Sequence, residues 1–166
     1  MNAGLEARAR ISLLVLDVDG VLTDGRLWFG PDGETLKAFH VRDGLGIKRL
    51  REAGIEVAVI SGRSSTAVAR RMAELGVAQV LQGVSDKGRA LADLLTRLGR
   101  SASETACLVD DTPDLPMMQA VGLPAAVADA HPDVLAAAEH VTALAGGNGA
   151  VREFCDWLLD ARRSES

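Results

Sequence analysis

The sequence predicts one α/β domain: a doubly wound, Rossmann-like parallel sheet with helices on both faces, a β-hairpin inserted after the first strand, and no cap domain. Three observations predict this fold. Strand-length aliphatic runs alternate with helix-length amphipathic segments throughout the chain, which is typical of βαβ units. Glycines close several of the helical segments, where a left-handed residue ends a helix. The 166 residues suffice for one domain and leave little room for a second.

Each strand is predicted from an aliphatic run, and each helix from apolar residues at helical spacing. Residues 13–18 are aliphatic up to a polar end, which is typical of a strand buried on both faces. The expected strands cover residues 13–18, 56–60, 78–81, 105–109, 125–127 and 141–143. The expected helices cover residues 44–53, 64–75, 86–98, 114–120, 132–138 and 150–159.

Residues 26–41 interrupt the alternation and predict a hairpin around the turn Gly30-Pro31-Asp32-Gly33. A lone two-stranded hairpin is marginal in water. This one displays more apolar side chains than one face can bury, so either it folds onto its own domain as a flap or it pairs with copies of itself in a homo-oligomer. We favour the second interpretation and expect a homotetramer. The apolar residues are Leu27, Trp28, Phe29, Leu36 and Phe39.

The glycine-rich segment 145–166 contains Gly146-Gly147-Asn148-Gly149 near its start. Such a stretch is usually a flexible linker, but it also permits close backbone approach to a ligand or to a neighbouring subunit. We expect a tail that can reach across an interface.

Composition excludes several classes of protein. The net charge of −5 argues against nucleic-acid binding, and the absence of a membrane-length apolar run or a signal peptide favours a cytoplasmic protein without a membrane partner. Cys107 and Cys155 have neither disulfide-framework nor zinc-site spacing, so we expect reduced core residues.

Two carboxylates follow the first predicted strand in Asp17-Val18-Asp19-Gly20. Residues two apart on a strand point the same way, so Asp17 and Asp19 face one side. Ligands of open parallel sheets bind beyond the carboxyl ends of the strands. Turn and cap aspartates are the structural alternative for such a short motif.

A second acidic cluster follows the strand at 105–109 and contains Asp110, Asp111 and Asp114. Gathering these acids with Asp17 and Asp19 without a cation would be electrostatically prohibitive. An all-oxygen ligand set without EF-hand spacing suits Mg²⁺. The alternative is that Asp111 and Asp114 cap separate helices.

Two further predicted element ends supply phosphate donors. Ser61 and Gly62 follow the strand at 56–60, where a hydroxyl, a backbone amide and a helix N-terminus can bind phosphate. Lys87 begins the helix after Ser85-Asp86 and can meet both phosphate and the acids.

This constellation resembles the haloacid dehalogenase superfamily, and more closely its 3-deoxy-D-manno-octulosonate 8-phosphate phosphatases and related sugar-acid phosphatases. Two departures stand out: Val109 replaces a glycine that is usual there, and Asn148 replaces an arginine typical of the glycine-rich segment. The matching stretches are DVDGVLTDG at 17–25, HVRDGLGIKRL at 40–50, ISGR at 60–63, LVDDTPDLPMM at 108–118, VADAHPDV at 127–134 and AGGNGAVRE at 145–153.

The resemblance implies an Mg²⁺-dependent phosphatase of lipopolysaccharide precursor synthesis, acting on 3-deoxy-D-manno-octulosonate 8-phosphate. Asp17 would be the nucleophile that forms an aspartyl-phosphate, and Asp19 the general acid and base. Ser61, the Gly62 amide and Lys87 would hold the phosphoryl oxygens.

The resemblance also implies a metal site. Mg²⁺ would be held by the Asp17 carboxylate, the Asp19 main-chain carbonyl and Asp110. Asp111 and Asp114 would act through metal-bound waters or by supporting these ligands.

Larger members of the resembling superfamily cover the site with a cap domain inserted after the first or second motif. Here the segments between Asp19 and Gly44 and between Arg63 and Lys87 are too short for a cap, so something outside the domain must shield the site. In the resembling phosphatases the neighbouring subunits of a tetramer shield the site. Arg42, Arg63 and Arg152 are candidates for binding the substrate carboxylate, with ordinary surface salt bridges as the alternative. Two other functions stay open: a phosphatase of a related nonulosonate 9-phosphate, and a non-catalytic oligomerisation module of the same fold.

Overall fold

The computed structural model describes residues 3–163. Its main sheet has six strands, all paired in parallel, in the order β5-β4-β1-β6-β7-β8. This order confirms the doubly wound fold, because the chain runs outward from β1 in one direction and then in the other. The strands are β1 (Leu13–Leu16), β4 (Glu56–Ile60), β5 (Gln79–Leu81), β6 (Thr105–Val109), β7 (Leu123–Ala126) and β8 (His140–Val141).

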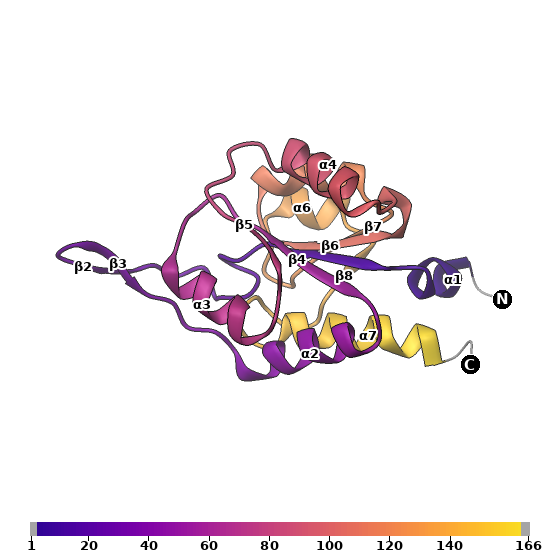
Figure 1. Ribbon diagram of the computed structural model, residues 1–166, viewed down its shortest axis with the longest axis horizontal. Helices are drawn as coiled ribbons and strands as arrows, with labels where there is room; N and C mark the ends of the chain where they lie inside the picture. The colour runs from indigo at the N-terminus through magenta and orange to yellow at the C-terminus, as the bar shows by residue number, and fades with distance from the viewer. Residues whose placement is uncertain (1–2, 164–166) are drawn as a thin grey trace.

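Helices cover both faces of the sheet (Figure 1). In Figure 1, α2, α3 and α7 lie below the strands, while α4 and α6 lie above them. No cap domain covers the sheet in the described part of the chain, as expected. The helices are α1 (Ala3–Ala9), α2 (Val41–Glu52), α3 (Thr66–Glu74), α4 (Lys87–Leu98), α5 (Leu115–Ala120), α6 (Pro132–Ala137) and α7 (Ala150–Arg163), and two short 3₁₀ helices cover Ala102–Glu104 and Thr112–Asp114.

The central strand β1 is buried along its whole length, which explains its uninterrupted aliphatic sequence. Leu16 pairs with Val59 of β4 on one side and with Leu108 of β6 on the other. The residues that follow these three strands therefore emerge at one edge of the sheet, where the functional residues were predicted.

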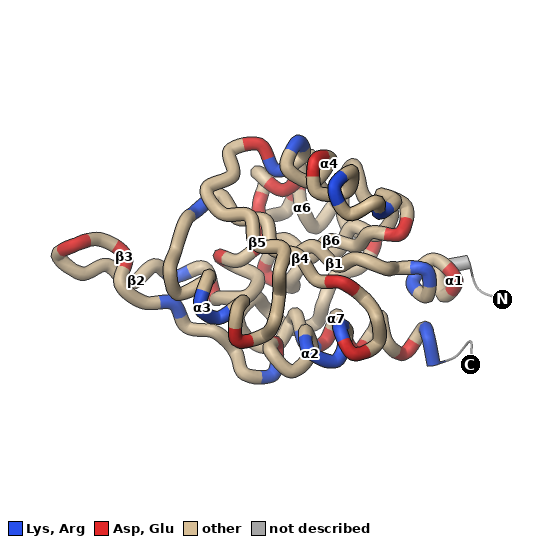
Figure 2. The backbone as a smooth tube through the Cα atoms, viewed as in Figure 1, with Lys and Arg blue, Asp and Glu red and all other residues tan. Residues whose placement is uncertain are grey.

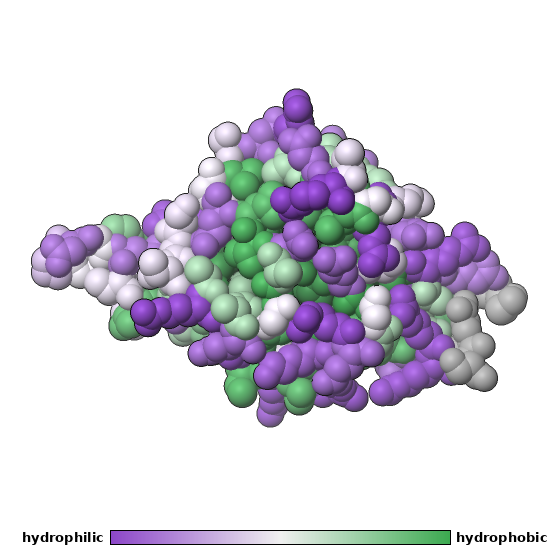
Figure 3. Space-filling model, in the orientation of Figure 1, coloured by the Kyte–Doolittle hydropathy of each residue, from purple (hydrophilic) through white to green (hydrophobic). Residues whose placement is uncertain are grey.

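The hairpin forms as predicted from β2 (Trp28–Gly30) and β3 (Gly33–Leu36), and it projects from the body as a narrow arm (Figures 1 and 3). Trp28, Phe29 and Leu36 expose 57%, 66% and 65% of their surface. Phe39 differs from the prediction: it lies beyond β3 and packs, partly buried, against the core of the domain.

The prediction that residues 146–149 are free to reach across an interface was wrong, whereas the helix predicted at 150–159 forms; residues 164–166 of the predicted tail lie outside the described residues. Gly147 donates a backbone hydrogen bond to the Val21 carbonyl at 2.9 Å, so this turn is docked on its own chain. The helix α7 then runs to Arg163, and side chains such as Phe154 are fully buried. Glycine content suggests a flexible segment, whereas Gly146 and Gly147 allow close packing between backbones.

The helix α1 was not predicted. It is held by tertiary contacts that the sequence does not reveal locally: the Arg8 guanidinium lies 4.2 Å from the ring centroid of Trp157 in α7. Smaller differences concern the ends of elements. For example, α2 begins three residues before the predicted Gly44, because His40 caps it by accepting a hydrogen bond from the Arg42 amide.

Both cysteines are buried and free, as predicted. Within residues 3–163, no helix is both long enough and apolar enough to cross a bilayer. Figure 2 shows Lys and Arg interspersed with Asp and Glu along the helices.

Candidate active site

A pocket lies beyond the carboxyl ends of β1, β4 and β6, and it gathers nearly all the predicted site residues. Asp17 and Asp19 follow β1, Ser61 and Gly62 follow β4, and Asp110 follows β6. Because the chain leaves β1 in opposite directions along the sheet, this is the point where parallel sheets bind ligands. The lining residues are Asp17, Asp19, Ser61, Gly62, Arg63, Lys87, Asp110, Asp111, Pro113 and Asp114.

Lys87 joins the two acidic motifs. Its Nζ lies 2.9 Å from Asp17 Oδ1 and 2.5 Å from Asp114 Oδ1, and all three side chains are buried. Burial alone would lower the pKa of Lys87, but the charges of Asp17 and Asp114 outweigh it and raise that pKa. The lysine is therefore held as a cation beside the predicted nucleophile. Asp86 fixes its position by capping α4 through the Arg89 amide.

Three carboxylates form a cluster that fits a divalent cation. Asp17, Asp110 and Asp114 each offer an oxygen, and these oxygens lie within 4.8 Å of one another. Asp110 Oδ1 is buried and has no hydrogen-bond partner among the described residues. Burial, followed by the charge of Asp17, raises the pKa of both Asp110 and Asp114. An all-oxygen set of crowded carboxylates is suited to a hard cation such as Mg²⁺.

Close backbone packing positions the loop that carries Asp19. Gly20 has a φ of +90°, and a Cβ built on it would lie 1.9 Å from Asp110 Oδ2. A Cβ on Gly146 would lie 1.7 Å from the Gly20 carbonyl oxygen, and the Gly146 amide donates to Asp129 Oδ1 at 2.9 Å. The segments around Asp129 and Gly146 therefore pack against the loop of Asp19 and Gly20, which we call the site loop, and brace it.

Asn148 belongs to the same brace. Its Nδ2 donates to the Gly146 carbonyl at 2.9 Å, so the residue that departs from the family pattern stabilises the glycine turn.

The phosphate donors differ from the prediction in one respect. Ser61 is buried and Gly62 lies beside it, as expected. The helix α3, however, begins only at Thr66, so the Gly62 amide belongs to a loop and not to a helix N-terminus. A bend at residues 62–63 and two further loop residues precede the first turn of the helix.

Asp111 is a helix cap as well as a lining residue. Its side chain accepts a hydrogen bond from the Thr112 amide at 2.7 Å, while Asp114 Oδ2 lies 3.4 Å from the Asp111 amide. This reciprocal pair fixes the turn that carries Asp114. Asp111 therefore caps a helix, as the alternative interpretation predicted, and it also lines the pocket.

Lys37 is the site residue that the sequence did not reveal. It lies just after β3, and its side chain, only 1% exposed, donates a hydrogen bond to Asp19 Oδ1. Glu34 accepts from the same Nζ at 2.9 Å and from Arg63 at 2.8 Å. Burial opposes the charge on Lys37, but the hydrogen bonds that it donates to Asp19 and Glu34 prevail and raise the pKa of Lys37.

Of the three arginines considered for a substrate carboxylate, only Arg63 lines the pocket. Arg152 Nε donates instead to Asp156 Oδ2 at 2.7 Å, and its side chain packs on Gly46 where α2 meets α7. Arg42 is exposed on the first turn of α2 and is not among the lining residues.

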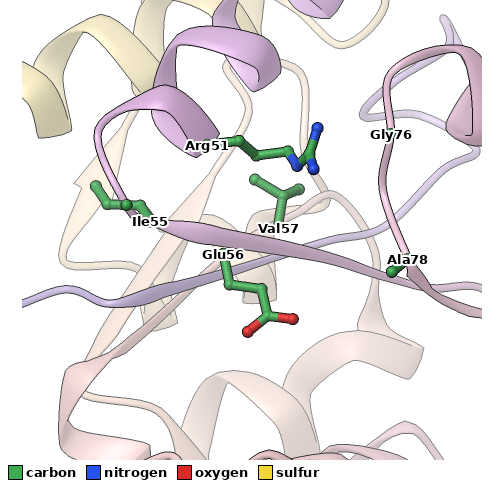
Figure 4. Close-up of a pocket in the computed structure, with 7 residues that line it drawn as sticks. Arg51, Ile55, Glu56, Val57, Gly76 and Ala78 are labelled. Atoms are coloured by element: carbon green, nitrogen blue, oxygen red, sulfur yellow. The ribbon is translucent and has the colours of Figure 1, made fainter.

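A second hollow lies at the opposite end of β4 and offers no comparable chemistry (Figure 4). Arg51 and Glu56 lie on opposite sides of the strand in Figure 4. The Arg51 guanidinium already donates to the Leu75 carbonyl at 2.8 Å, and Glu56 pairs with Arg100 at 3.6 Å. The two side chains therefore do not converge on a common ligand.

Comparison with known proteins identifies phosphatases as relatives of this chain. Residues 76–154 match the family of haloacid dehalogenase-like hydrolases. The 3-deoxy-D-manno-octulosonate 8-phosphate phosphatase KdsC of Escherichia coli K12 is 50% identical over 163 residues, which cover 98% of this chain and 87% of that protein.

Solved structures agree along the whole domain. The phosphatase of that name from Moraxella catarrhalis, in complex with magnesium, phosphate and a KDO molecule, aligns with a TM-score of 0.94 and 40% identity, covering 99% of this chain and 94% of that one. The cobalt-bound enzyme from Haemophilus influenzae aligns with a TM-score of 0.93 and 46% identity, covering 95% and 92%. The chain therefore belongs to the 3-deoxy-D-manno-octulosonate 8-phosphate phosphatase family of haloacid dehalogenase-like hydrolases, and it is a phosphoric monoester hydrolase.

Proposed function

We propose that the protein hydrolyses 3-deoxy-D-manno-octulosonate 8-phosphate to the free sugar acid and phosphate, with Mg²⁺ and through an aspartyl-phosphate on Asp17. The observation that carries the proposal is the convergence of Asp17, Lys87 and Asp110 in one pocket. The 50% identity to a relative of that name supports this substrate.

In the first half-reaction, an Asp17 carboxylate oxygen attacks phosphorus in line with the ester bond. The new bond joins Asp17 to phosphorus, and the electron pair of the broken bond goes to the sugar oxygen. Asp19 gives that oxygen a proton, so the sugar acid leaves as an alcohol. Lys87, Ser61 and the Gly62 amide hold the phosphoryl oxygens on which charge develops.

In the second half-reaction, Asp19 takes a proton from a water molecule that attacks the aspartyl-phosphate. Phosphate leaves and the Asp17 carboxylate is restored. The carboxylates of Asp17 and Asp110, with the Asp19 main-chain carbonyl, would hold Mg²⁺, which when bound neutralises the repulsion between the nucleophile and the phosphate. Asp114 holds Lys87, and Asp111 fixes the turn that carries Asp114.

A homotetramer assembled through the hairpins would provide the shield that this capless domain lacks. Trp28 and Phe29 leave a large apolar surface in a single copy, and such surfaces mark partners. Replacing both with Ser should lower the molar mass measured by light scattering and relax substrate selectivity together. A wild-type protein that is monomeric and fully selective would contradict this assembly.

A phosphate-release assay tests the proposed function. The panel contains 3-deoxy-D-manno-octulosonate 8-phosphate, a nonulosonate 9-phosphate and simple sugar phosphates, each with Mg²⁺ and with excess EDTA. We expect the octulosonate ester to give the highest kcat/KM, and both EDTA and Asp17→Asn to abolish turnover. A preference for the nonulosonate ester would reassign the substrate, and full activity of Asp17→Asn would overturn the mechanism.

A further inference from the structure

We propose that Lys37 is a positioning residue for Asp19, held in place by Glu34, so that the hairpin arm controls proton transfer to the leaving group. The inference rests on the proposed function, because it assigns to Asp19 the role of general acid. It adds a residue and a structural element that lie outside the segments carrying Asp17, Ser61, Lys87 and Asp110.

Lys37 determines the orientation of the Asp19 carboxylate. Lys37 engages only Oδ1, and among residues 3–163 no other hydrogen bond to this carboxylate is seen. Two-point attachment through the backbone and Oδ1 fixes the plane of the carboxyl group. Oδ2 then remains as the oxygen that can carry a proton to the substrate, and the Asp19 side chain, which lines the pocket, is 19% exposed.

Lys37 is itself restrained by a chain of ion pairs. A lysine has a flexible stem and positions a partner only if it is itself restrained. Glu34 accepts from its Nζ at 2.9 Å, and Glu34 is in turn held by Arg63 Nη2 at 2.8 Å and Nε at 3.3 Å. Because Arg63 follows β4 and Glu34 lies in β3, this chain of ion pairs ties the hairpin to the loop that follows β4.

Loss of Lys37 would misplace Asp19 and slow proton donation to the leaving group. A displacement of about 1 Å at a reacting group costs about 100-fold in rate. Proton donation matters for an alkyl ester, whose alkoxide is a poor leaving group, and hardly at all for p-nitrophenyl phosphate, whose phenolate leaves unaided. Loss of Lys37 should therefore separate the two kinds of substrate, whereas loosening of the fold would slow both alike.

The experiment measures kcat/KM, which reports the steps up to formation of the aspartyl-phosphate, for Lys37→Met. The substrates are 3-deoxy-D-manno-octulosonate 8-phosphate, ribose 5-phosphate and p-nitrophenyl phosphate. We expect a loss of about 100-fold on both alkyl esters and less than about fivefold on p-nitrophenyl phosphate. Glu34→Gln, which keeps the shape of the side chain, should also lose more kcat/KM on the alkyl esters than on p-nitrophenyl phosphate, but the losses should be smaller.

The matched control is Arg26→Met, which removes another hairpin cation. Arg26 pairs with the exposed Asp24 at 3.2 Å and does not touch Asp19, so all three substrates should retain wild-type kinetics. Equal losses on all three substrates in both Lys37→Met and Glu34→Gln would overturn the proposal. A loss confined to the carboxylate-bearing ester would also overturn it, because Lys37 would then bind the substrate acid. Failure of the proposed function looks different: the wild type would release no phosphate, or Asp17→Asn would remain active.

Discussion

Gly146→Ala places a methyl group where two backbone segments already touch. The added Cβ would lie 1.7 Å from the Gly20 carbonyl oxygen, far below the 3.0 Å that such contacts respect. Neither side can yield by rotating a side chain, since both sides are backbone. The turn must move by more than about 1 Å, an overpacking that costs about 1–3 kcal/mol.

The movement also breaks two hydrogen bonds. The Gly146 amide loses Asp129 Oδ1 and the Gly147 amide loses the Val21 carbonyl, both at 2.9 Å. At about 1 kcal/mol for each bond, the total destabilisation is about 4 kcal/mol, a large part of a typical stability of about 5–15 kcal/mol. The site loop carries Gly20 and Asp19, so the affinity for Mg²⁺ should fall as well.

Urea unfolding and the Mg²⁺ dependence of phosphate release measure both effects. Gly54→Ala is the control, because Gly54 has a φ of +80° but a Cβ there meets nothing within 4 Å. It should cost about 1–2 kcal/mol, the penalty of a left-handed backbone for alanine, and leave the Mg²⁺ dependence unchanged. If Gly146→Ala behaves like Gly54→Ala in both assays, the glycine turn does not brace the site loop and the reasoning fails.

Three further predictions concern charges. Lys87→Met should lower kcat at least about 100-fold in steady-state assays, because it removes the buried cation beside Asp17. Mg²⁺ at 100 times its Kd should stabilise the wild type by about 2.7 kcal/mol in thermal melts, and Asp110→Asn should lose most of this gain. Burial raises the pKa of Asp43, so above that pKa the ionised side chain destabilises the fold. Asp43→Asn removes this charge, and its gain in free energy of unfolding over wild type should be largest near about pH 8. The gain should shrink as the pH falls toward about 4, where Asp43 of the wild type becomes protonated.

Each of these predictions has a contradicting result. Near-normal turnover of Lys87→Met would remove that lysine from the phosphate site. An equal Mg²⁺ shift in Asp110→Asn would place the metal elsewhere. A constant difference between Asp43→Asn and wild type across the pH range would show that Asp43 does not titrate differently in the folded and unfolded states.

The sheet and the acidic centre of the site could be predicted because their signals are local. Strands buried on both faces require aliphatic runs, and the groups that follow parallel strands meet at one edge whatever the loops do. Asp17, Asp110 and Lys87 each stand at the end or the start of such an element. Their convergence therefore follows from topology alone.

Lys37 could not be predicted, because its role depends on how the hairpin meets the body. Alternation along β3 ends at Leu36, so the side on which the next residue points is set by the bend of the chain and not by strand period. The same limit explains Arg152. Its place in a matching motif suggested the substrate, whereas the structure packs it between α2 and α7 beside Gly46. Helix packing of this kind is non-local information.

The chemical state of Asp17 during turnover tests the central claim most directly. Wild type and Asp17→Asn are mixed with 3-deoxy-D-manno-octulosonate 8-phosphate and Mg²⁺, quenched in acid within the first turnover, and digested for mass spectrometry. The mechanism predicts one phosphoryl group on the peptide containing Asp17 in the wild type and none in the variant. Burst release of phosphate with that peptide unmodified at every quench time would contradict it, because water would then attack the ester directly.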